Sequence, residues 1–322
     1  MAATPAAQLR CNTMNSTSIN NSLETGKLKY LTKWRYISSI FSIVLMLVSL
    51  SVIGVKGFNW GLDFTGGVVT EIQLDHRITA SEIQPLMTAA YQQDVSVISA
   101  SEPGRWVLRY ANIPDEQLRP DLRQVLAPLN TDITVLNSSI VGPQVGQELV
   151  EQGSIALLIA MLCIMGYLSF RFEWRLASGA LLALVHDVVF VLAFFALSQM
   201  EFNLTILAAI LAILGYSLND SIIIADRIRE QLVAKLQWKT SDINNLAVKT
   251  TFSRTMITSG TTLLTVVALW IMGGEPLEGF SIAMFIGILT GTWSSISIGA
   301  TLPEFLGLKA QHYQEVPLPD HP

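Results

Sequence analysis

Residues 211–230, LAILGYSLNDSIIIADRIRE, decide the fold, because a long apolar run encloses one acidic residue and then ends in charged residues. Asp226, Arg227 and Arg229 mark the place where a membrane-spanning helix would reach water. Asp220 would lie about 9 Å deeper than Asp226 at the helical rise per residue. A charged side chain in mid-membrane costs about 2.5–3.5 kcal/mol on insertion scales, so it must face protein or water. The stretch therefore predicts a transmembrane helix that carries a carboxyl group inside a helix bundle.

The whole chain has the composition of a membrane protein. Its 322 residues are 51% hydrophobic and 14% charged, with a mean hydropathy of +0.46. A soluble domain carries about 25% charged residues, and a helix needs roughly 20 apolar residues to cross a bilayer. Six stretches meet this requirement: Tyr36–Val55, Gly153–Phe170, Leu176–Leu197, Leu204–Ala225, Met256–Met272 and Phe280–Leu302.

Basic residues in short loops predict the orientation of these six helices, because cytoplasmic loops are enriched in Lys and Arg. They occur before the first helix and in the second-to-third and fourth-to-fifth loops: Lys27, Lys29, Lys33, Arg35; Arg171, Arg175; Arg227, Arg229, Lys235, Lys239 and Lys249. The short loops on the other side contain Glu201, Glu275 and Glu278 and no Lys or Arg. Both termini are therefore expected in the cytoplasm.

The segment between the first two helices reads as a small soluble domain. Residues 68–74 alternate like a strand, and residues 81–91 follow a Thr/Ser cap like a helix. Further expected elements are strands at residues 95–100 and 105–110, a helix at residues 115–126, and a strand at residues 133–141. The order β-α-β-β-α-β is the ferredoxin-like pattern.

The predicted fold class is thus an α-helical polytopic membrane protein with six transmembrane helices and a small periplasmic α+β domain between helices 1 and 2. The expected divisions are a disordered cytoplasmic tail, the first helix, the periplasmic domain, the five remaining helices and a cytoplasmic tail. Their residue ranges are 1–29, 30–56, 57–146, 147–308 and 309–322.

A glycine-rich motif follows the first helix. It contains Gly61, Asp63, Phe64, Gly66 and Gly67. Glycines permit tight turns where the chain changes direction. The motif is interpreted as a structural turn into the first strand, with ligand binding as the alternative.

Candidate proton-carrying residues lie in three of the predicted helices. Asp220 has Asn219 beside it, and His186 and Asp187 interrupt the apolar run of the third helix. Removal from water disfavours the ionised form of a carboxyl group, so such a group can load and release protons. For His186 a structural hydrogen bond between helices explains the residue equally well. Arg254 begins the fifth helix on the same membrane side as Asp220, where the two could form a switchable ion pair.

Several functional classes are excluded by what the sequence lacks. It contains no nucleotide-binding loop, nucleophile elbow, HExxH motif or zinc-ligand spacing. Neither Cys11 nor Cys163 resembles a disulfide partner or a metal ligand. The net charge of −5 gives no support for nucleic-acid binding. We therefore expect neither enzymatic activity, nor a cofactor, nor a nucleic-acid partner, and the energy source would be the proton gradient.

At these residues the chain resembles the SecF branch of the SecD/SecF protein-export family, which is related to RND transporters. The matching strings are GLDFTGG at 61–67, ALVHD at 183–187, GYSLNDS at 215–221, DRIRE at 226–230, RTMITSGTT at 254–262 and GGEPLEGF at 273–280. By position, Asp220 and Arg254 match proton-pathway residues of the family, and His186 and Asp187 match a recurring motif. The first 26 residues have no counterpart in the family pattern.

The resemblance implies a multi-pass protein of the bacterial inner membrane that promotes protein translocation with a SecD partner. The implied partners are SecD, the SecYEG translocon, the ATPase SecA, YajC and YidC, membrane lipid, and unfolded preprotein through the periplasmic domain. SecD would contribute a second six-helix half and another essential aspartate. Two alternatives remain open: an RND-like exporter half for a small molecule or lipid, and a scaffold of the export complex without proton coupling.

Overall fold

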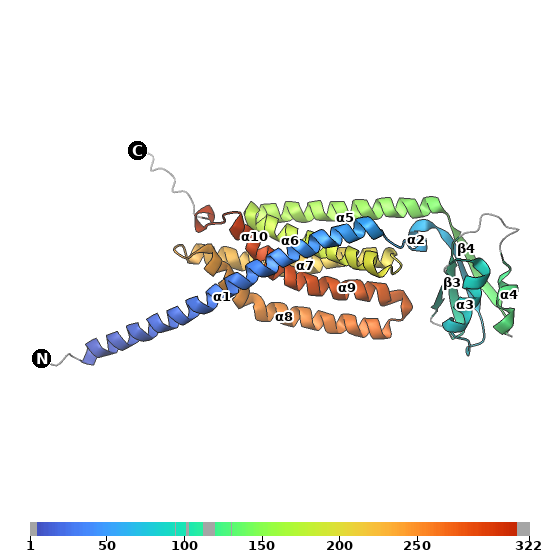
Figure 1. The fold of residues 1–322 in the computed structure, drawn as a ribbon, viewed down its shortest axis with the longest axis horizontal. Coiled ribbons are helices and arrows are strands. Elements are labelled where there is room, and N and C mark those ends of the chain that lie inside the picture. The colour runs from blue at the N-terminus through green and yellow to red at the C-terminus, as the bar shows by residue number, and fades with distance from the viewer. Residues whose placement is uncertain (1–4, 94, 101–102, 112–119, 130, 314–322) are drawn as a thin grey trace.

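The computed structural model describes residues 5–93, 95–100, 103–111, 120–129 and 131–313, and side chains there except those of residues 5–29, 141, 143–145 and 275. Long helices form an elongated bundle, and a small β-sheet with short helices lies at one end of it (Figure 1). We call this part the sheet domain. The first and last described residues lie at the opposite end of the bundle.

The six predicted transmembrane helices are confirmed. Among the described residues, six helical segments are long and apolar enough to cross a membrane: Tyr30–Lys56, Gly146–Arg171, Trp174–Ser198, Leu204–Ala234, Thr240–Met272 and Pro276–Phe305. They belong to α1 (Pro5–Lys56), α5 (Pro143–Arg171), α6 (Trp174–Ser198), α7 (Leu204–Ala234), α8 (Thr240–Met272) and α9 (Glu275–Ser294), the last continued by η3 (Ser295–Gly299) and α10 (Ala300–Phe305). Most extend beyond the predicted apolar stretches, because a helix continues into polar residues where its backbone hydrogen bonds remain available.

Helix α1 differs from expectation at its N-terminal end. The sequence predicts a disordered tail over residues 1–29, whereas the helix begins at Pro5. Adding a residue to a helix that is already formed costs little, since each added residue gains one backbone hydrogen bond. The predicted divisions between tail, domain and bundle otherwise stay predictions.

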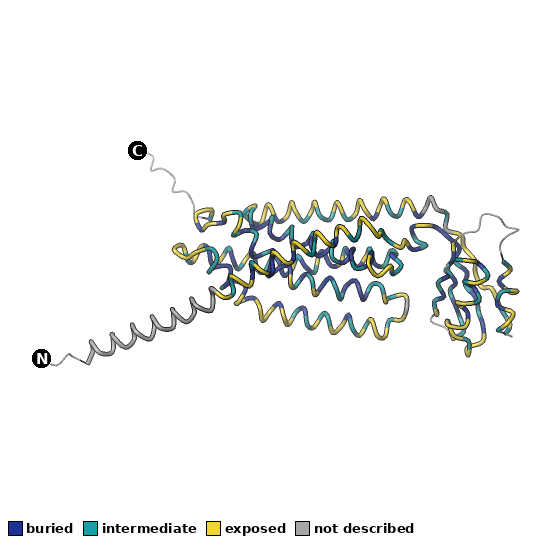
Figure 2. The backbone as a smooth tube through the Cα atoms, in the orientation of Figure 1, coloured by how far each residue is buried: buried dark blue, intermediate teal, exposed yellow. Residues whose placement is uncertain are grey.

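Three helices form the interior of the bundle, and three lie outside them. Buried residues concentrate on α6, α7 and α9, whereas α5, α8 and residues 30–56 of α1 have many exposed side chains among those described (Figure 2). The last span is not a continuous α-helix, because η3 is a π-helical segment. Such π-helical turns are rare and frequently lie at functional sites.

The sheet domain has the predicted ferredoxin-like fold. Its elements are β1 (Gly67–Gln73), α3 (Ala80–Tyr91), β2 (Ser96–Ser99), β3 (Arg105–Tyr110), α4 (Leu122–Val125), η2 (Ala127–Leu129) and β4 (Thr134–Val141). The antiparallel strands have the order β2-β3-β1-β4. Thr79 and Glu82 form a capping box at the start of α3, as the Thr/Ser cap predicts. The side of the sheet that faces α3 and α4 forms a separate hydrophobic core, which includes Val68, Ile72 and Leu108.

One element of this domain is shorter than predicted. A helix was expected over residues 115–126, and the described part of it is α4 followed by η2. The first half of the prediction lies outside the described residues. Asp121 caps α4 by accepting a hydrogen bond from the amide of Arg123 at 3.1 Å, so the helix has a definite start there.

Candidate functional site

Asp220 lies in the interior of the bundle, as the sequence predicts. It belongs to α7 and has a relative exposure of 1%. Neither of its carboxylate oxygens has a hydrogen-bond partner among the described residues. The hydroxyl of Ser221, next in the chain, is likewise buried without a partner there. A buried polar group without a partner costs about 1–3 kcal/mol, and more when charged, so this arrangement is expensive to maintain.

Arg254 lies on α8, which packs against α7. The side chains of Arg254 and Asp220 form no salt bridge within 4.0 Å among the described pairs. Arg254 is exposed on the outer side of α8. The predicted ion pair is therefore not formed in this structure.

Asp187 has the opposite environment, since it is fully buried and accepts several hydrogen bonds. Its Oδ2 atom accepts bonds from the hydroxyls of Ser217 on α7 at 2.5 Å and Ser294 on α9 at 2.9 Å. Its Oδ1 atom lies 3.1 Å from Nδ1 of His186. One carboxyl group thus connects three interior helices. Interhelical hydrogen bonds, which were the alternative explanation for His186, are accepted here by Asp187.

His186 contributes a second unsatisfied group. It is buried on α6, and its Nε2 atom has no partner among the described residues. Its ring lies 6.0 Å from that of Phe190, in a stacked arrangement. The imidazole therefore has one ring nitrogen beside Asp187 and the other available for a proton or a further partner.

The two acidic residues are linked through α7. Ser217, which binds Asp187, lies three residues before Asp220, and residues at this spacing share one helix face. Gly291 allows the close approach of α9, because a Cβ atom there would lie 3.2 Å from Ser217 Oγ and 3.3 Å from Asp187 Oδ2. Asn219 is exposed on the other side of α7, so the structure does not bring it together with this cluster.

The glycine-rich motif forms a compact connection between α1 and β1. It contains the single-turn helix α2 (Leu62–Thr65), which starts after Gly61 and ends at Gly66 with φ of 74°. Gly66 thus occupies a backbone region that L-residues rarely adopt. At Gly67 a Cβ atom would lie 2.7 Å from both Leu62 and the carbonyl oxygen of Tyr110. The structural interpretation of these glycines agrees with their positions.

The same motif is attached to the beginning of α7. The Oδ2 atom of Asp63 accepts a hydrogen bond from the backbone amide of Leu204 at 3.1 Å. The backbone amide of Gly61 donates to the carbonyl of Phe202 at 2.9 Å, and Phe64 stacks on the ring of Phe202. A carboxylate at a helix N-terminus complements the helix dipole. The segment that leads into the sheet domain is therefore fastened to the helix that carries Asp220.

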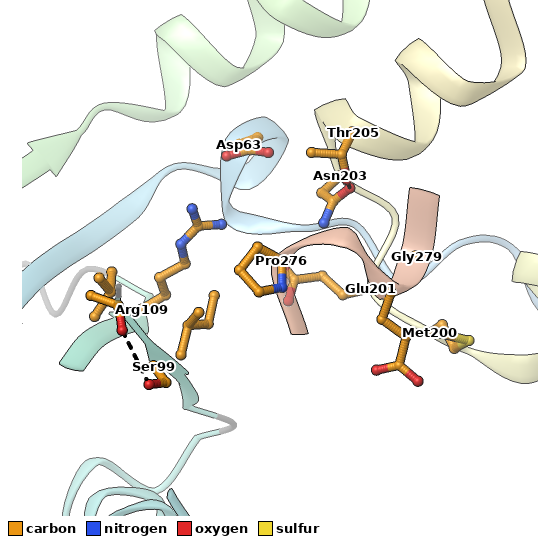
Figure 3. Close-up of a pocket in the computed structure, with 13 residues that line it drawn as sticks. Asp63, Ser99, Arg109, Met200, Glu201, Asn203, Thr205, Pro276 and Gly279 are labelled. Carbon is orange, nitrogen blue, oxygen red and sulfur yellow. Dashed lines mark hydrogen bonds between the residues drawn. The ribbon is translucent and has the colours of Figure 1, made fainter. Parts of the chain in front are cut away.

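A cavity of about 520 Å³ separates the sheet domain from this end of the bundle. Figure 3 shows Ser99 and Arg109 from the sheet domain on one side, with Asp63 and the ends of the transmembrane helices opposite. The sheet contributes its helix-free face, since Arg109 pairs with Ser96 and Val107 with Ile98 on the side away from the domain core. Contact between the two parts is thus incomplete on this side.

Sequence reasoning missed a buried ion pair at the opposite end of the bundle. Arg35 was interpreted only as a basic residue at the membrane boundary, yet it is 1% exposed. Its guanidinium donates to Glu304 at 2.7 Å, to the side chain of Asn245 at 2.8 Å and to the carbonyl of Ala300 at 3.0 Å. Tyr36 also donates to Glu304 at 3.0 Å. The local sequence gave no indication of this burial, because Lys33 precedes Arg35 and an apolar run follows it, as at an ordinary helix boundary.

The described residues contain no group of three or more His, Cys, Asp or Glu side chains that could hold a metal ion. What the site offers chemically is therefore a set of buried acids, an imidazole and hydroxyls. Such groups can bind and pass protons.

Comparison with known proteins agrees with this architecture. The family model described as "Protein export membrane protein SecD/SecF, C-terminal" matches residues 121–309, and "SecD/SecF GG Motif" matches residues 51–76. A protein translocase subunit SecF from Vibrio alginolyticus is 37% identical, with 87% of this chain and 90% of the relative covered. A SecF from Escherichia coli O157:H7 is 39% identical, with 87% and 88% covered.

Two solved structures are also similar. SecDF from Thermus thermophilus, described as a translocon-associated membrane protein, gives a TM-score of 0.71 at 31% identity over 85% of this chain. A second SecDF structure, in a super-membrane-facing form, gives 0.68 at 32% identity over 84%. The chain spans 38% of the length of each of these SecDF chains. The six spans, the ferredoxin-like domain, the matched family models and the relatives together show that this chain belongs to the SecD/SecF family, as a SecF protein translocase subunit.

Proposed function

We propose that this SecF subunit, together with SecD, uses the proton gradient to promote protein translocation across the bacterial inner membrane. In this proposal the subunit acts through SecYEG after the SecA-driven step, with YajC and YidC as accessory partners. Both termini face the cytoplasm, and the sheet domain lies in the periplasm, where unfolded preprotein emerges. Asp220 is the proton-carrying group.

The single observation that carries the proposal is the unpaired burial of Asp220. A buried ionised carboxylate without hydrogen-bond donors is strongly disfavoured. Its charge state must therefore depend on whether neighbouring helices supply a partner or exclude one. The open distance to Arg254 supports this mechanism, because closure of the pair would favour the charged form and separation the protonated form. A scaffold without proton coupling gains nothing from such a group.

A change in the protonation of Asp220 must be transmitted to the sheet domain, and α7 connects the two. Its N-terminal residue Leu204 is held by Asp63, whereas Asp220 lies further along the same helix. A shift of α7 on proton binding would therefore displace the segment that leads into β1. One proton crossing about 100 mV releases about 2.3 kcal/mol, which is comparable with the few kcal/mol that separate conformational states.

The test compares Asp220→Asn with Asp226→Asn on the same helix. Asp226 is exposed and pairs with Arg171 at 2.7 Å, so its replacement removes a carboxylate without touching the bundle interior. Export of a slowly secreted preprotein is measured in inverted membrane vesicles containing SecD, with and without a proton gradient. We expect Asp220→Asn to remove the gradient-dependent acceleration and Asp226→Asn to retain it.

Assembly with SecD is measured on the same membranes by co-purification. An Asp220→Asn protein that assembles and still responds fully to the gradient would refute proton coupling through this residue. That result would favour the scaffold alternative. The RND-like exporter alternative predicts instead that preprotein export is unchanged while efflux of a small molecule or lipid is lost.

A further inference from the structure

The cavity between the sheet domain and the bundle contains an arginine without a partner. Arg109 extends from β3 into the cavity (Figure 3), and its Nε atom is buried with no hydrogen-bond partner among the described residues. Its guanidinium forms no ion pair within 4.0 Å among the described pairs. A buried polar group without a partner is costly, and more so when it is charged. The cavity therefore holds a positive charge that the protein itself does not neutralise.

Acidic side chains line the same cavity on the side of the bundle. Glu201 lies in the loop between α6 and α7, and Glu278 lies near the start of α9, where it is exposed. Glu201 also lines a second cavity of about 340 Å³, which it shares with Arg109. Neither glutamate forms a salt bridge within 4.0 Å among the described pairs. Asp63 is a third acid of the wall, but its carboxylate already accepts a backbone hydrogen bond at the start of α7.

The cavity lies where the apolar parts of the spans end. Leu197 and Met272 are exposed apolar residues at the ends of α6 and α8, and the cavity residues Met200 and Pro276 follow them by three or four positions. Trp60, which lines the second cavity, is 42% exposed at this end of the bundle. Tryptophan is enriched at the boundary between membrane and water. The cavity is therefore at the height of the lipid headgroups on the side of the sheet domain.

We propose that this cavity binds the headgroup of a membrane phospholipid that carries both a phosphate and a primary ammonium group, as phosphatidylethanolamine does. Arg109 binds the phosphate, because a planar guanidinium matches phosphate oxygens with two parallel hydrogen bonds. Glu201 and Glu278 accept hydrogen bonds from the ammonium group. The cavity volume of about 520 Å³ falls in the range of roughly 300–1,000 Å³ that is typical of small-molecule sites.

Other headgroups fit these charges less well. Phosphatidylglycerol has a phosphate but no cation, so Glu201 and Glu278 would face an anion without compensation. The quaternary ammonium of phosphatidylcholine has no N–H donor, and proteins recognise it with aromatic side chains. No aromatic residue is among the described residues that line the 520 Å³ cavity. The primary ammonium is therefore the cation that suits carboxylate acceptors here.

A preprotein segment is the competing occupant. Passing chains of varied sequence offer no constant pair of opposite charges for Arg109 and the two glutamates. The height of the cavity also favours a molecule that is always present at the membrane surface. The inference does not depend on proton coupling or on which partner receives the preprotein.

The experiment titrates the purified SecD–SecF complex in detergent with phosphatidylethanolamine, phosphatidylcholine and phosphatidylglycerol of identical acyl chains, and native mass spectrometry counts the bound lipid. We expect phosphatidylethanolamine to bind most tightly. Arg109→Gln should weaken its binding about tenfold, since this factor corresponds to one lost charge-assisted hydrogen bond. Arg109→Lys keeps the charge and should weaken binding less. Arg123→Gln is the matched control, because Arg123 is exposed on α4 at the other face of the sheet.

Replacement of the acids tests the ammonium half of the site. Glu201→Gln combined with Glu278→Gln should remove the preference for phosphatidylethanolamine over phosphatidylglycerol, which a purely structural role would not do. Equal binding of the three lipids by the parent complex, or unchanged binding by Arg109→Gln, would overturn the proposal. Displacement of the lipid by inorganic phosphate as effectively as by phosphoethanolamine would also overturn it, because the site would then bind any phosphate.

A photo-crosslinking amino acid at position 99 locates the bound molecule in vesicles of phosphatidylethanolamine and phosphatidylglycerol. Ser99 lines the cavity, whereas Ala89 is exposed on α3 and supplies the control position. We expect a phosphatidylethanolamine adduct at position 99 and only background at position 89. A preprotein adduct in place of the lipid would refute the inference. The Asp220→Asn complex should bind the lipid like the parent complex, so failure of proton coupling and failure of lipid binding are distinguishable.

Discussion

At the scale of single residues, two buried acids in one bundle have contrasting surroundings. Asp187 receives hydrogen bonds from Ser217 and Ser294, which stabilise its carboxyl group where it is. Asp220 has no such donors among the described residues. A buried polar network in which every group is hydrogen-bonded holds its helices in one arrangement. A buried group without hydrogen-bond partners is instead stabilised by any conformational change that supplies them. In the proposed mechanism Asp187 is therefore a fixed junction, and Asp220 is the group whose protonation state changes.

Ser217→Ala tests the role of Asp187 as a junction. The substitution removes one donor to a fully buried carboxyl group, and hydrogen bonds to charged groups contribute about 1.5–3 kcal/mol. We expect a loss of stability in this range, measured as a lower midpoint of thermal unfolding in detergent. Ser253→Ala on the exposed side of α8 serves as the control and should have little effect. Equal midpoints for the two variants would contradict a stabilising role for the Ser217 bond.

Sequence reasoning located the interior acids because a charged residue inside an apolar run has few explanations. It placed Asp220 and the His186–Asp187 pair in the bundle, and both acids are buried there. It did not distinguish their roles, since hydrogen-bond donors come from α7 and α9, far away in the chain. It missed Arg35 because a basic residue before an apolar run has the same pattern whether it faces water or a buried glutamate. Asn219 was included among the candidate proton-pathway residues only because it precedes Asp220 in the sequence.

At the scale of elements, the network around Arg35 joins α1, the start of α8 and α10. Asn244 on α8 donates to the carbonyl of Ala300 at 2.8 Å, and Arg35 pairs with Glu304. These bonds fix the end of the bundle from which α8 runs toward Arg254.

The sequence predicts well that the helices exist, because the length of an apolar stretch is a local property of the sequence. Contacts between helix ends depend on partners more than two hundred residues apart, which no local pattern records.

Separate and combined replacement of Arg35 and Glu304 tests this network. Removing one partner of a buried ion pair costs about 3–5 kcal/mol, because the other charge is left uncompensated. We expect Arg35→Met and Glu304→Gln each to lower the unfolding midpoint strongly, and the double variant to be less destabilised than the sum of the two. Strictly additive losses would show that the two side chains do not act as a pair.

The turn that joins α1 to the sheet domain offers a matched glycine comparison. Gly66 has φ of 74° and ψ of 164°, a backbone region that is essentially limited to glycine, and holding an L-residue there costs about 1–3 kcal/mol. Gly54 lies within α1, and a Cβ atom added there would have no neighbouring atom within 4 Å. Alanine at position 54 should therefore be neutral or favourable by up to about 1 kcal/mol. We expect Gly66→Ala to destabilise the subunit and Gly54→Ala not to do so. Chemical denaturation of both variants in detergent measures the difference, and similar losses would argue against backbone strain at Gly66.

At the scale of the whole molecule, the sheet domain and the bundle are joined firmly on one side and only in part on the other. The firm side is the glycine-rich motif with Asp63 at the start of α7. The open side is the cavity between the helix-free face of β2 and β3 and the beginning of α9. The sequence predicted both folds but not the cavity between them, because the cavity is lined by residues that lie far apart in the chain. We predict that the domain tilts about the motif during transport.

Locking the open side tests whether that tilt is needed for transport. Ser99→Cys and Glu278→Cys place thiols on opposite walls of the cavity, in a protein whose Cys11 and Cys163 are replaced by Ala. Joining them with a short bifunctional thiol reagent should remove gradient-dependent export while SecD still co-purifies. Each single-cysteine variant treated with the same reagent controls for modification alone. A reducible reagent should allow activity to return on reduction, since the covalent structure of the bundle is unaltered. Full export by the joined protein would mean that the sheet domain does its work without moving relative to the helices that carry Asp220 and Asp187.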